Sequence, residues 1–380
     1  MLIIDTDSHI IEAADLWTAR MSKKKWGDNI PTVRWDEKTQ MEAWFVGGKR
    51  FANAWSAAWV GWEKPFPSAP PRRENVYPPA LDAAERVKVM DQTGIRAAVL
   101  YPNLAFVGYS IHKSLADPAY QLDVLRAYND WLMDWVSVAP DRFIPLALTP
   151  YWDIDAAVAE VGRAAGMGYR GVVFPASPHT QNLPFLGDRH WDRLWSALQE
   201  AGMSVNFHAG EGDMSAYIGE ARLKLEGPAL MVARAQPTAF LYTAIQLVDL
   251  LHSGVLPRFP KLKFVFAECG IGWVPFVLEA SDHHFIRNKV RAEHPEFELM
   301  PSEYYRRQVY SNYWFEDLEE WHIQKVGLGS ILFETDFPHP TCLHGSQVQE
   351  AVNSRLKNVD KATRDAILWK NAADLYGVKV

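Results

Sequence analysis

Short apolar segments recur along most of the chain, and each is followed by a longer segment whose apolar residues have helical spacing. The short segments lack the apolar–polar alternation of a half-exposed sheet, so they predict strands that are buried on both faces. The predicted strands cover residues 2–4, 97–101, 143–148, 171–174, 204–207, 263–266, 309–311 and 331–333. The predicted helices cover residues 81–92, 120–137, 154–167, 191–201, 238–251, 273–291, 316–326 and 361–376.

About eight strands that alternate with helices predict an α/β protein, and this order favours a (β/α)₈ TIM barrel over a doubly wound sheet. The chain has 380 residues, which suits one barrel domain with insertions over residues 1–380. No Gly-x-Gly-x-x-Gly segment follows a predicted strand, and no Walker-type Gly-Lys-Ser/Thr segment occurs. Nucleotide binding is therefore not predicted.

Residues from about 11 to 79 do not fit this alternation and are predicted to be an N-terminal insertion rich in Trp and Pro. Such a long irregular stretch is usually a lid, a binding loop or an interface arm. We expect a lid that also contributes to a subunit interface. The whole chain has 16 Trp, 18 Phe and 14 Tyr, which indicates either a large core in a tightly packed oligomer or a pocket for a flat aromatic substrate.

Composition and charge narrow the function classes. The net charge is -7, and an acidic surface argues against binding to a nucleic-acid backbone. No run of about 18 apolar residues predicts a membrane span. The N-terminal segment lacks the features of a signal peptide, so we expect a cytoplasmic protein. The two cysteines, Cys269 and Cys342, fit a reducing compartment, and we expect both to be buried thiols.

Carboxylate and imidazole side chains follow several predicted strands, at the end of a barrel where active sites lie. Asp7 and His9 follow the first strand and are two residues apart, so an extended backbone directs both to the same side. His208 follows the fifth strand and Asp336 the eighth. Two nitrogen and two oxygen ligands would hold Zn²⁺ or a similar ion and leave a position open for water or substrate. Taken singly, each residue could instead be a helix cap or a satisfied polar group, and Asp5 could be a ligand or a deeper orienting group.

Several segments of the chain carry a resemblance to a known family. They cover residues 4–9, 207–210, 254–263 and 335–339, of which the last two are the most specific. In them the chain resembles the amidohydrolase superfamily, in particular the amidohydrolase-2 branch with aminocarboxymuconate-semialdehyde decarboxylase and the aromatic-acid decarboxylases. The resemblance implies one metal ion, since no lysine follows the fourth strand where binuclear members carry one. Together with the Trp-rich insertion, it also implies a homodimer.

Two positions depart from the family pattern. The family carries His-x-His or Glu-x-His after the first strand, whereas this chain has Asp7-x-His9. A carboxylate there favours a harder ion, so Mn²⁺ rivals Zn²⁺. Glu268 follows the sixth strand, where the semialdehyde decarboxylases have a histidine for acid–base work. Glu268 is either a general base with a raised pKa or a partner of a nearby cation or ligand.

Two reactions suit these residues. In a decarboxylase, the ion would chelate the substrate carboxylate and a neighbouring oxygen while Asp336 delivers a proton to the ring carbon. In a hydrolase of an ester, amide, lactone or C–C bond, metal-bound hydroxide would attack a carbonyl, and Asp336 would shuttle the proton with His339 or Glu268 assisting. We favour a carbon–carbon lyase that acts on a small aromatic or unsaturated carboxylic acid, because the resemblance is to decarboxylases. A non-catalytic metal-binding protein would need a broken ligand set, and all four positions are filled.

Three further residues are candidates for substrate contacts. A decarboxylase needs a cation near the metal for the substrate carboxylate, and Arg222 and Arg234 lie in the stretch after His208. Either arginine could instead be exposed or ion-paired. His179 follows the fourth strand and could reach the substrate.

Overall fold

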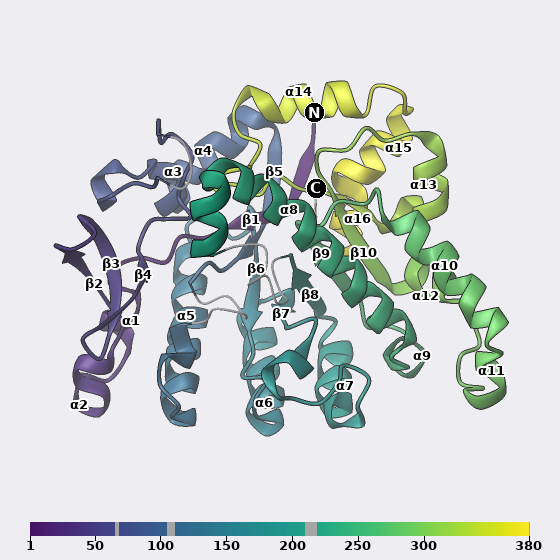
Figure 1. Cartoon of the computed structure of the whole chain (residues 1–380), viewed down its shortest axis with the longest axis horizontal. Coiled ribbons are helices and arrows are strands. Elements are labelled where there is room, and N and C mark those ends of the chain that lie inside the picture. Colours follow the sequence, from purple (N-terminus) through teal and green to yellow (C-terminus); the bar gives the residue numbers. More distant parts are fainter. Residues whose placement is uncertain (65–67, 105–110, 210–218, 380) are drawn as a thin grey trace.

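A single sheet of eight parallel strands forms the centre of the molecule (Figure 1). The computed structural model describes residues 1–64, 68–104, 111–209 and 219–379. The eight strands follow one another around the sheet in chain order: β1 (Ile3–His9), β5 (Ile95–Tyr101), β6 (Phe143–Leu148), β7 (Gly171–Val173), β8 (Ser204–His208), β9 (Phe264–Ala267), β10 (Val309–Tyr313) and β11 (Ile331–Phe333). All eight predicted strands are confirmed.

The sheet closes between β1 and the chain that follows β11. The backbone N–H of Asp336 donates to the carbonyl oxygen of Asp7 at 2.9 Å, and that of His9 donates to the carbonyl oxygen of Phe337 at 2.6 Å. Ser8 and Phe337 form a parallel bridge between the same two segments. The closure confirms the predicted (β/α)₈ barrel. It also places the residues after β11 directly beside the last residues of β1.

Helices cover the outside of the barrel, and α5, α6 and α7 lie side by side along it (Figure 1). Every residue of β1, β6, β8 and β9 is buried, as expected for strands between a filled interior and a layer of helices. The helices that correspond to predicted ones are α4 (Ala83–Thr93), α5 (Pro118–Val136), α6 (Ile154–Met167), α7 (Asp192–Ala201), α8 (Glu220–His252), α10 (Val274–Arg287), α13 (Glu320–Val326), and the continuous run of α15 (Lys361–Asp365), the π-helical turn η7 (Ala366–Lys370) and α16 (Asn371–Tyr376).

Local capping explains why the helix boundaries could be predicted. At the start of α6, the carboxylate of Asp153 accepts a hydrogen bond from the N–H of Ala156 at 3.0 Å. At its end, Gly168 has a φ of 100°, a left-handed conformation that glycine adopts without strain. The structure therefore has the helix over the same residues, 154–167, as the prediction.

The prediction of α8 was too short. The helix begins at Glu220 rather than at residue 238 and has a break at Gly227, where φ is 75°. Gly227, Pro228 and Pro237 concealed its first half, because both residue types disfavour a helix interior. Further helices were not predicted: α1 (Leu16–Arg20), α2 (Lys23–Trp26), α3 (Pro78–Leu81), α9 (Val255–Arg258), α11 (Val290–Glu293), α12 (Pro301–Gln308) and α14 (Ser346–Arg355). None of the helices within the described ranges has the length and apolar character needed to cross a membrane.

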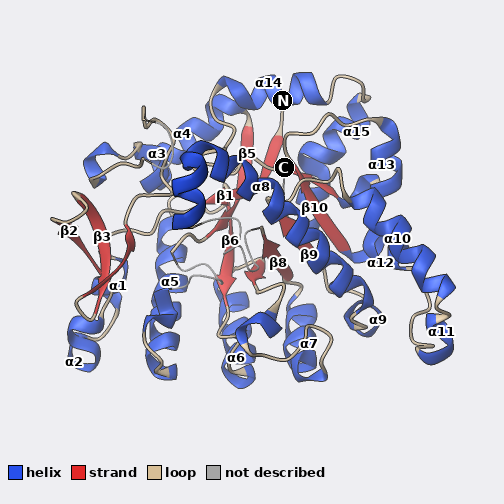
Figure 2. Cartoon of the chain, viewed as in Figure 1, coloured by secondary structure: helices blue, strands red, loops and turns tan. Residues whose placement is uncertain are grey.

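The insertion is more regular than the sequence indicated. It contains an antiparallel sheet of β2 (Thr32–Asp36), β3 (Met41–Val46) and β4 (Lys49–Asn53), which stands apart from the barrel strands (Figure 2). The expectation of an irregular stretch was therefore wrong. The overlooked signal was Gly47-Gly48 between two strand-like segments, since both residues have positive φ, as a tight hairpin requires. The segment 65–67 of the insertion lies outside the described residues.

Candidate metal centre

Four side chains from three strand ends converge at the carboxyl end of the barrel. Asp7 and His9 belong to the last residues of β1, His208 ends β8, and Asp336 follows β11. The Nε2 atoms of His9 and His208 lie 3.1 Å apart. Oδ1 of Asp7 is 3.3 Å from His9 Nε2, and Oδ2 of Asp7 is 3.3 Å from His208 Nε2. Oδ1 of Asp336 lies 3.4 Å from His9 Nε2, so the structure brings all four predicted ligands together.

Both histidines are held with the same nitrogen facing the cluster. Nδ1 of His9 lies 3.2 Å from the carbonyl oxygen of Pro102, and Nδ1 of His208 lies 3.0 Å from that of Ala209. A carbonyl oxygen can only accept, so each Nδ1 carries a proton and donates it. In a neutral ring, this leaves the lone pair on Nε2, which points into the cluster. A backbone carbonyl behind a histidine is the usual support of a metal ligand.

The carboxylates of the cluster provide the test of whether a cation fits. Both side-chain oxygens of Asp7 and Oδ1 of Asp336 are buried and accept no hydrogen bond from the described residues. Buried acceptors are nearly always satisfied, so such oxygens mark the place of a missing partner. Ligand atoms of Asp7, His9 and His208 all lie within 4.8 Å of one another. Two imidazoles and two carboxylates match the donor preferences of Zn²⁺ and Mn²⁺, and the residues therefore fit a single divalent ion.

Burial and mutual charge set the protonation of the cluster. Burial lowers the pKa of His9 to about 4, which keeps the ring neutral and able to act as a ligand. Burial also opposes a charge on His208, but the carboxylates of Asp7 and Glu268 outweigh it and raise the pKa of His208 to about 10. Burial likewise opposes a charge on Asp7, yet the two imidazoles hold its pKa well below its usual range. In the metal-free protein, a proton on His208 therefore occupies the place of a cation.

Asp336 and His339 form a pair at the edge of the cluster. Oδ1 of Asp336 lies 2.8 Å from Nδ1 of His339, and the ring of His339 stacks on that of His9 with 3.7 Å between centroids. Burial, reinforced by the charge of Asp7, raises the pKa of Asp336 well above its usual range, and burial lowers the pKa of His339 to about 3. Asp336 also has a φ of 59°, in the left-handed region that few residues other than glycine adopt.

Glu268 lies on the Nδ1 side of the His208 ring, whereas Asp7 lies on the Nε2 side. Its Oε2 is 3.6 Å from His208 Nδ1, and its carboxylate is within 4.8 Å of ligand atoms of Asp7 and Asp336. Burial, and then the charge of Asp336, raises the pKa of Glu268 well above its usual range. Its backbone has a φ of 50°, and its N–H donates to the carboxylate of Glu334 at 2.9 Å. The geometry suits both of the roles expected from the sequence, a base and a partner of a ligand.

The interactions described for the three predicted substrate contacts are with residues outside this cluster. Arg222 and Arg234, on the first half of α8, both form an ion pair with Glu226. His179 is exposed in the turn after β7, and its ring lies against that of Phe185 with 4.8 Å between centroids. Their contact with a substrate stays a prediction.

Two residues near the ligands were missed in the sequence. Asn103, just after β5, accepts on Oδ1 from Nε2 of His339 at 2.6 Å, while its amide nitrogen donates to the carbonyl oxygen of Ile10 at 2.5 Å. It could have been found, because it follows a predicted strand at the same end as the ligands. Arg86 lies buried behind β1. It gave no signal, because an arginine on an amphipathic helix normally faces solvent.

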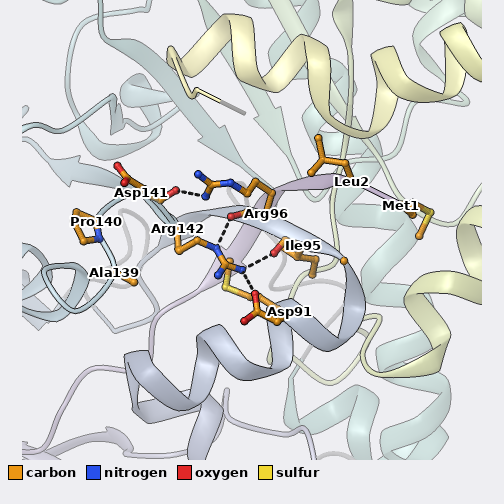
Figure 3. Close-up of a pocket in the computed structure, with 11 residues that line it drawn as sticks. Met1, Leu2, Asp91, Ile95, Arg96, Ala139, Pro140, Asp141 and Arg142 are labelled. Atoms are coloured by element: carbon orange, nitrogen blue, oxygen red, sulfur yellow. Dashed lines mark hydrogen bonds and ion pairs between the residues drawn. The ribbon is translucent and has the colours of Figure 1, made fainter.

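A hollow of about 590 Å³ lies at the other end of the barrel, beside the first residues of β1 and β5 (Figure 3). Its polar groups already have partners. Arg96 donates to the carbonyl oxygen of Asp141 at 2.7 Å, and Arg142 donates to the carbonyl oxygen of Arg96 and the carboxylate of Asp91, each at 2.7 Å. Barrel enzymes carry their chemistry at the carboxyl end, so these contacts belong to stability rather than to a reaction.

Several known proteins are similar to this chain. A family model described as amidohydrolase matches residues 4–378. Gamma-resorcylate decarboxylase from Polaromonas sp. strain JS666 is 25% identical over 303 residues, which are 77% of this chain and 86% of that protein. An amidohydrolase structure from Mycobacterium avium subsp. paratuberculosis K-10 matches with a TM-score of 0.75 and 24% identity over 99% of both chains. A dihydroxybenzoic acid decarboxylase from Polaromonas sp. JS666, solved with manganese and 2-nitroresorcinol, matches with a TM-score of 0.64 and 19% identity over 99% of this chain and 97% of that one.

The family match spans nearly the whole chain, so the resemblance noted in the sequence is confirmed. The chain belongs to the amidohydrolase family and is a metal-dependent enzyme of that superfamily.

Proposed function

We propose that the chain is a mononuclear metal-dependent decarboxylase, a carbon–carbon lyase that acts on a small aromatic or unsaturated carboxylic acid. The observation that carries the proposal is the buried cluster of Asp7, His9, His208 and Asp336, in which Asp336 is both the fourth ligand and the proposed acid. The decarboxylase relatives support the reaction class. The proposed ion is Mn²⁺ rather than Zn²⁺, because two of the four ligands are carboxylates.

The protein's own residues supply the proton. When bound, the ion supplies Lewis acidity toward the substrate carboxylate and a neighbouring oxygen. Asp336, whose pKa is raised by burial, carries the proton, and Nδ1 of His339 lies 2.8 Å from its Oδ1. Transfer of this proton to the ring carbon that bears the carboxylate leaves that carbon tetrahedral. The bond to the carboxylate then breaks, its electron pair returns to the ring, and carbon dioxide leaves. A proton from water restores the Asp336–His339 pair.

Burial of the site favours this chemistry. Asp7 and Asp336 are 0% exposed and His208 is 5% exposed, so little water competes for the proton or reacts with the protonated ring. His9 stacks on His339 and fixes the ring whose Nδ1 lies beside Oδ1 of Asp336. Asn103 accepts from Nε2 of the same ring. These two contacts keep the proton-bearing pair in one orientation.

The alternative is a hydrolase of an ester, amide, lactone or C–C bond that uses the same residues. In it, Glu268 or the Asp336–His339 pair removes a proton from the attacking water and returns it to the leaving group. The site residues suit both reactions, and the relatives favour the first. The two differ in their products, which makes them separable by experiment.

The test is carbon dioxide release by Mn²⁺-loaded protein from a panel of hydroxylated benzoic acids, run in D₂O. The proposal expects carbon dioxide and one deuterium at the vacated ring carbon. Hydrolysis of an ester, amide or lactone panel without any carbon dioxide release from the acids would overturn it in favour of the hydrolase. The Asp336→Asn variant serves as the blank for both panels.

The substrate contacts Arg222, Arg234 and His179 belong to the same proposal. Glu226 accepts from both arginines, so it holds the two guanidinium groups together on α8. A pair of guanidinium groups around one carboxylate retains a net positive charge for the substrate. The Arg234→Gln and His179→Gln variants should raise KM more than they lower kcat. An unchanged KM in either variant would remove that residue from the substrate site.

The insertion is proposed to act as a lid and to contribute to a dimer interface. The backbone N–H groups of Trp59 and Val60 donate to the carbonyl oxygen of Pro338 at 3.0 and 3.3 Å, between Asp336 and His339 in the chain. This contact supports a role for the insertion next to the site. Shortening residues 44–71 should therefore weaken substrate affinity or assembly. An unchanged KM would contradict the lid role, and an unchanged molecular mass of the assembly would contradict the interface role.

The proposed assembly is a homodimer in the cytoplasm. Large apolar side chains are exposed on two neighbouring outer helices, with Ile245 of α8 at 65% and Phe276 of α10 at 74% exposure. Such side chains favour burial against another subunit. Both cysteines are free and buried, as the sequence predicted, which fits a reducing compartment. Sedimentation equilibrium of the whole chain tests the dimer, and a monomer at micromolar concentration would contradict it.

A further inference from the structure

Arg86 is a buried cation directly behind the metal ligands of β1. It extends from α4, is 2% exposed, and donates from three different nitrogens. Its Nη1 donates to Ser8 Oγ at 2.9 Å and its Nη2 to the carbonyl oxygen of His9 at 3.0 Å. Its Nε donates to the carbonyl oxygen of Pro79, at the end of the insertion, at 2.6 Å. Two of the three bonds therefore hold the segment that carries Asp7 and His9.

The same side chain also reaches the segment that carries Asp336. The guanidinium carbon of Arg86 lies 4.3 Å from the centroid of the Phe337 ring, within the range of a cation–π contact. Ser8 Oγ, which accepts from Arg86, donates to the carbonyl oxygen of Phe337 at 3.2 Å. Arg86 thus contacts both sides of the seam where the barrel closes. The ligands on the two sides keep their separation only if this seam stays in register.

The burial of the Arg86 guanidinium group requires a physical explanation. Removing a cation from water costs several kcal/mol unless its donors are satisfied, and burial lowers the pKa of Arg86 to about 9, with the charge of Asp5 acting against that shift. An apolar side chain could fill the same space at less cost. It could not make directed bonds to Ser8, His9 and Pro79 at once.

We infer that Arg86 is a positioning residue that holds Asp7 and His9 in register with Asp336 for the metal ion. The inference rests on the metal centre proposed above and adds a residue that touches neither the ion nor the substrate. Partners behind metal ligands typically change metal affinity by about 10–100-fold when they are removed. Arg86 therefore acts on the affinity of the site for its ion, not on the chemical step.

Arg142 provides a matched control at the other end of the barrel (Figure 3). Like Arg86, it donates from several nitrogens to backbone carbonyls, namely those of Arg96 at 2.7 Å and Ile95 at 3.0 Å. It supports β5 at the end away from the ligands. Loss of Arg142 and loss of Arg86 both remove arginine bonds to the barrel backbone, but only the second acts on the metal ligands.

The experiment measures the Kd for Mn²⁺ in chelator-treated wild type, Arg86→Met and Arg142→Met, together with thermal unfolding of each metal-free protein. Arg86→Met should raise Kd by about tenfold or more, and kcat should recover at saturating Mn²⁺. Arg142→Met should lower the unfolding temperature and leave Kd within about twofold. Equal Kd values for wild type and Arg86→Met would overturn the inference while leaving the metal centre intact. Absence of binding by wild type would instead overturn the metal centre.

If Arg86→Met does not fold, Ser8→Ala replaces it. This variant removes the acceptor of Arg86 Nη1 and the donor to Phe337 without leaving a cavity of arginine size. A Kd for Mn²⁺ raised by several-fold supports the inference, and an unchanged Kd overturns it. Arg86→Lys keeps the charge but not the fork of three donors, so it should restore only part of the affinity.

Discussion

Charged side chains gather at both ends of the barrel, but they have different partners. At the amino end, Arg96 and Arg142 donate to backbone carbonyls and to the carboxylate of Asp91, which is 62% exposed. At the carboxyl end, Asp7 and Asp336 are fully buried, and three of their oxygens accept no hydrogen bond within the part of the chain that the structure describes. The comparison teaches that charge alone does not mark a reactive end. Buried carboxylate oxygens that lack a donor and lie beside imidazole nitrogens do.

Removal of the metal should have the largest effect at the carboxyl end. Dialysis against a strong chelator should abolish turnover, because no Lewis acid then acts on the substrate and a proton on His208 takes the place of the ion. Adding one equivalent of Mn²⁺ should restore turnover. Full turnover by protein shown to be free of metal would contradict the proposed chemistry.

The Asp336→Asn substitution should have the second-largest effect on turnover. It should lower kcat by about 10³-fold or more, because the variant loses both a ligand and its acid. The fold should persist, since the backbone N–H of Asp336 still donates to Asp7. The matched change at the other end, Asp91→Asn, should leave kcat unchanged and cost little stability, because it removes an exposed ion pair. Retained turnover in Asp336→Asn would remove Asp336 from the mechanism.

Glu268→Gln distinguishes the two roles of that carboxylate. As a general base or acid, Glu268 contributes about 10²-fold, so kcat at saturating Mn²⁺ should fall by that amount with metal content retained. If Glu268 only supports His208, the Kd for Mn²⁺ should rise and kcat at saturation should stay near that of wild type. We expect the rise in Kd, because the Asp336–His339 pair supplies the proton in the proposed decarboxylation and Oε2 of Glu268 lies 3.6 Å from Nδ1 of His208. A fall in kcat with metal content retained would instead assign Glu268 to proton transfer.

The smallest predicted effect is the dependence of Mn²⁺ affinity on pH. The pKa of His208 in the metal-free protein is raised to about 10, so at neutral pH an ion must displace its proton. Protonated His208 cannot be a ligand, and Mn²⁺ affinity should therefore increase with pH by roughly tenfold per unit for one proton displaced. Calorimetry in two buffers of different ionisation enthalpy would count that proton. Affinity that stays flat between about pH 6 and 8 would show that His208 is already neutral.

The strand order and the convergence of the four predicted ligands could be predicted from the sequence because both depend on local rules. The apolar segments predicted eight strands, and the residues just after them included Asp7, His9, His208 and Asp336. Once the strands are parallel, their carboxyl ends must meet. Asn103 also follows a strand, but it was not predicted as a site residue because Pro102 separates it from the end of β5.

The contacts that could not be predicted depend on packing between distant segments. Arg86 is buried only because α4 lies against β1 and Phe337, and no local pattern indicates this. The pairing of Arg222 and Arg234 with Glu226 depends on a helix that two prolines and a glycine concealed. The small sheet of the insertion was missed because its strands are only partly buried, which weakens the alternation on which strand prediction relies.

Elemental analysis of wild-type protein beside His208→Ala tests the central claim most directly. The account predicts about one Mn or Zn per wild-type chain and a loss of most of that metal in His208→Ala, whose fold should persist because the change is confined to the end of β8. Wild-type protein that holds no stoichiometric metal, even after reconstitution with Mn²⁺ or Zn²⁺, would contradict it. So would a His208→Ala variant that keeps a full equivalent.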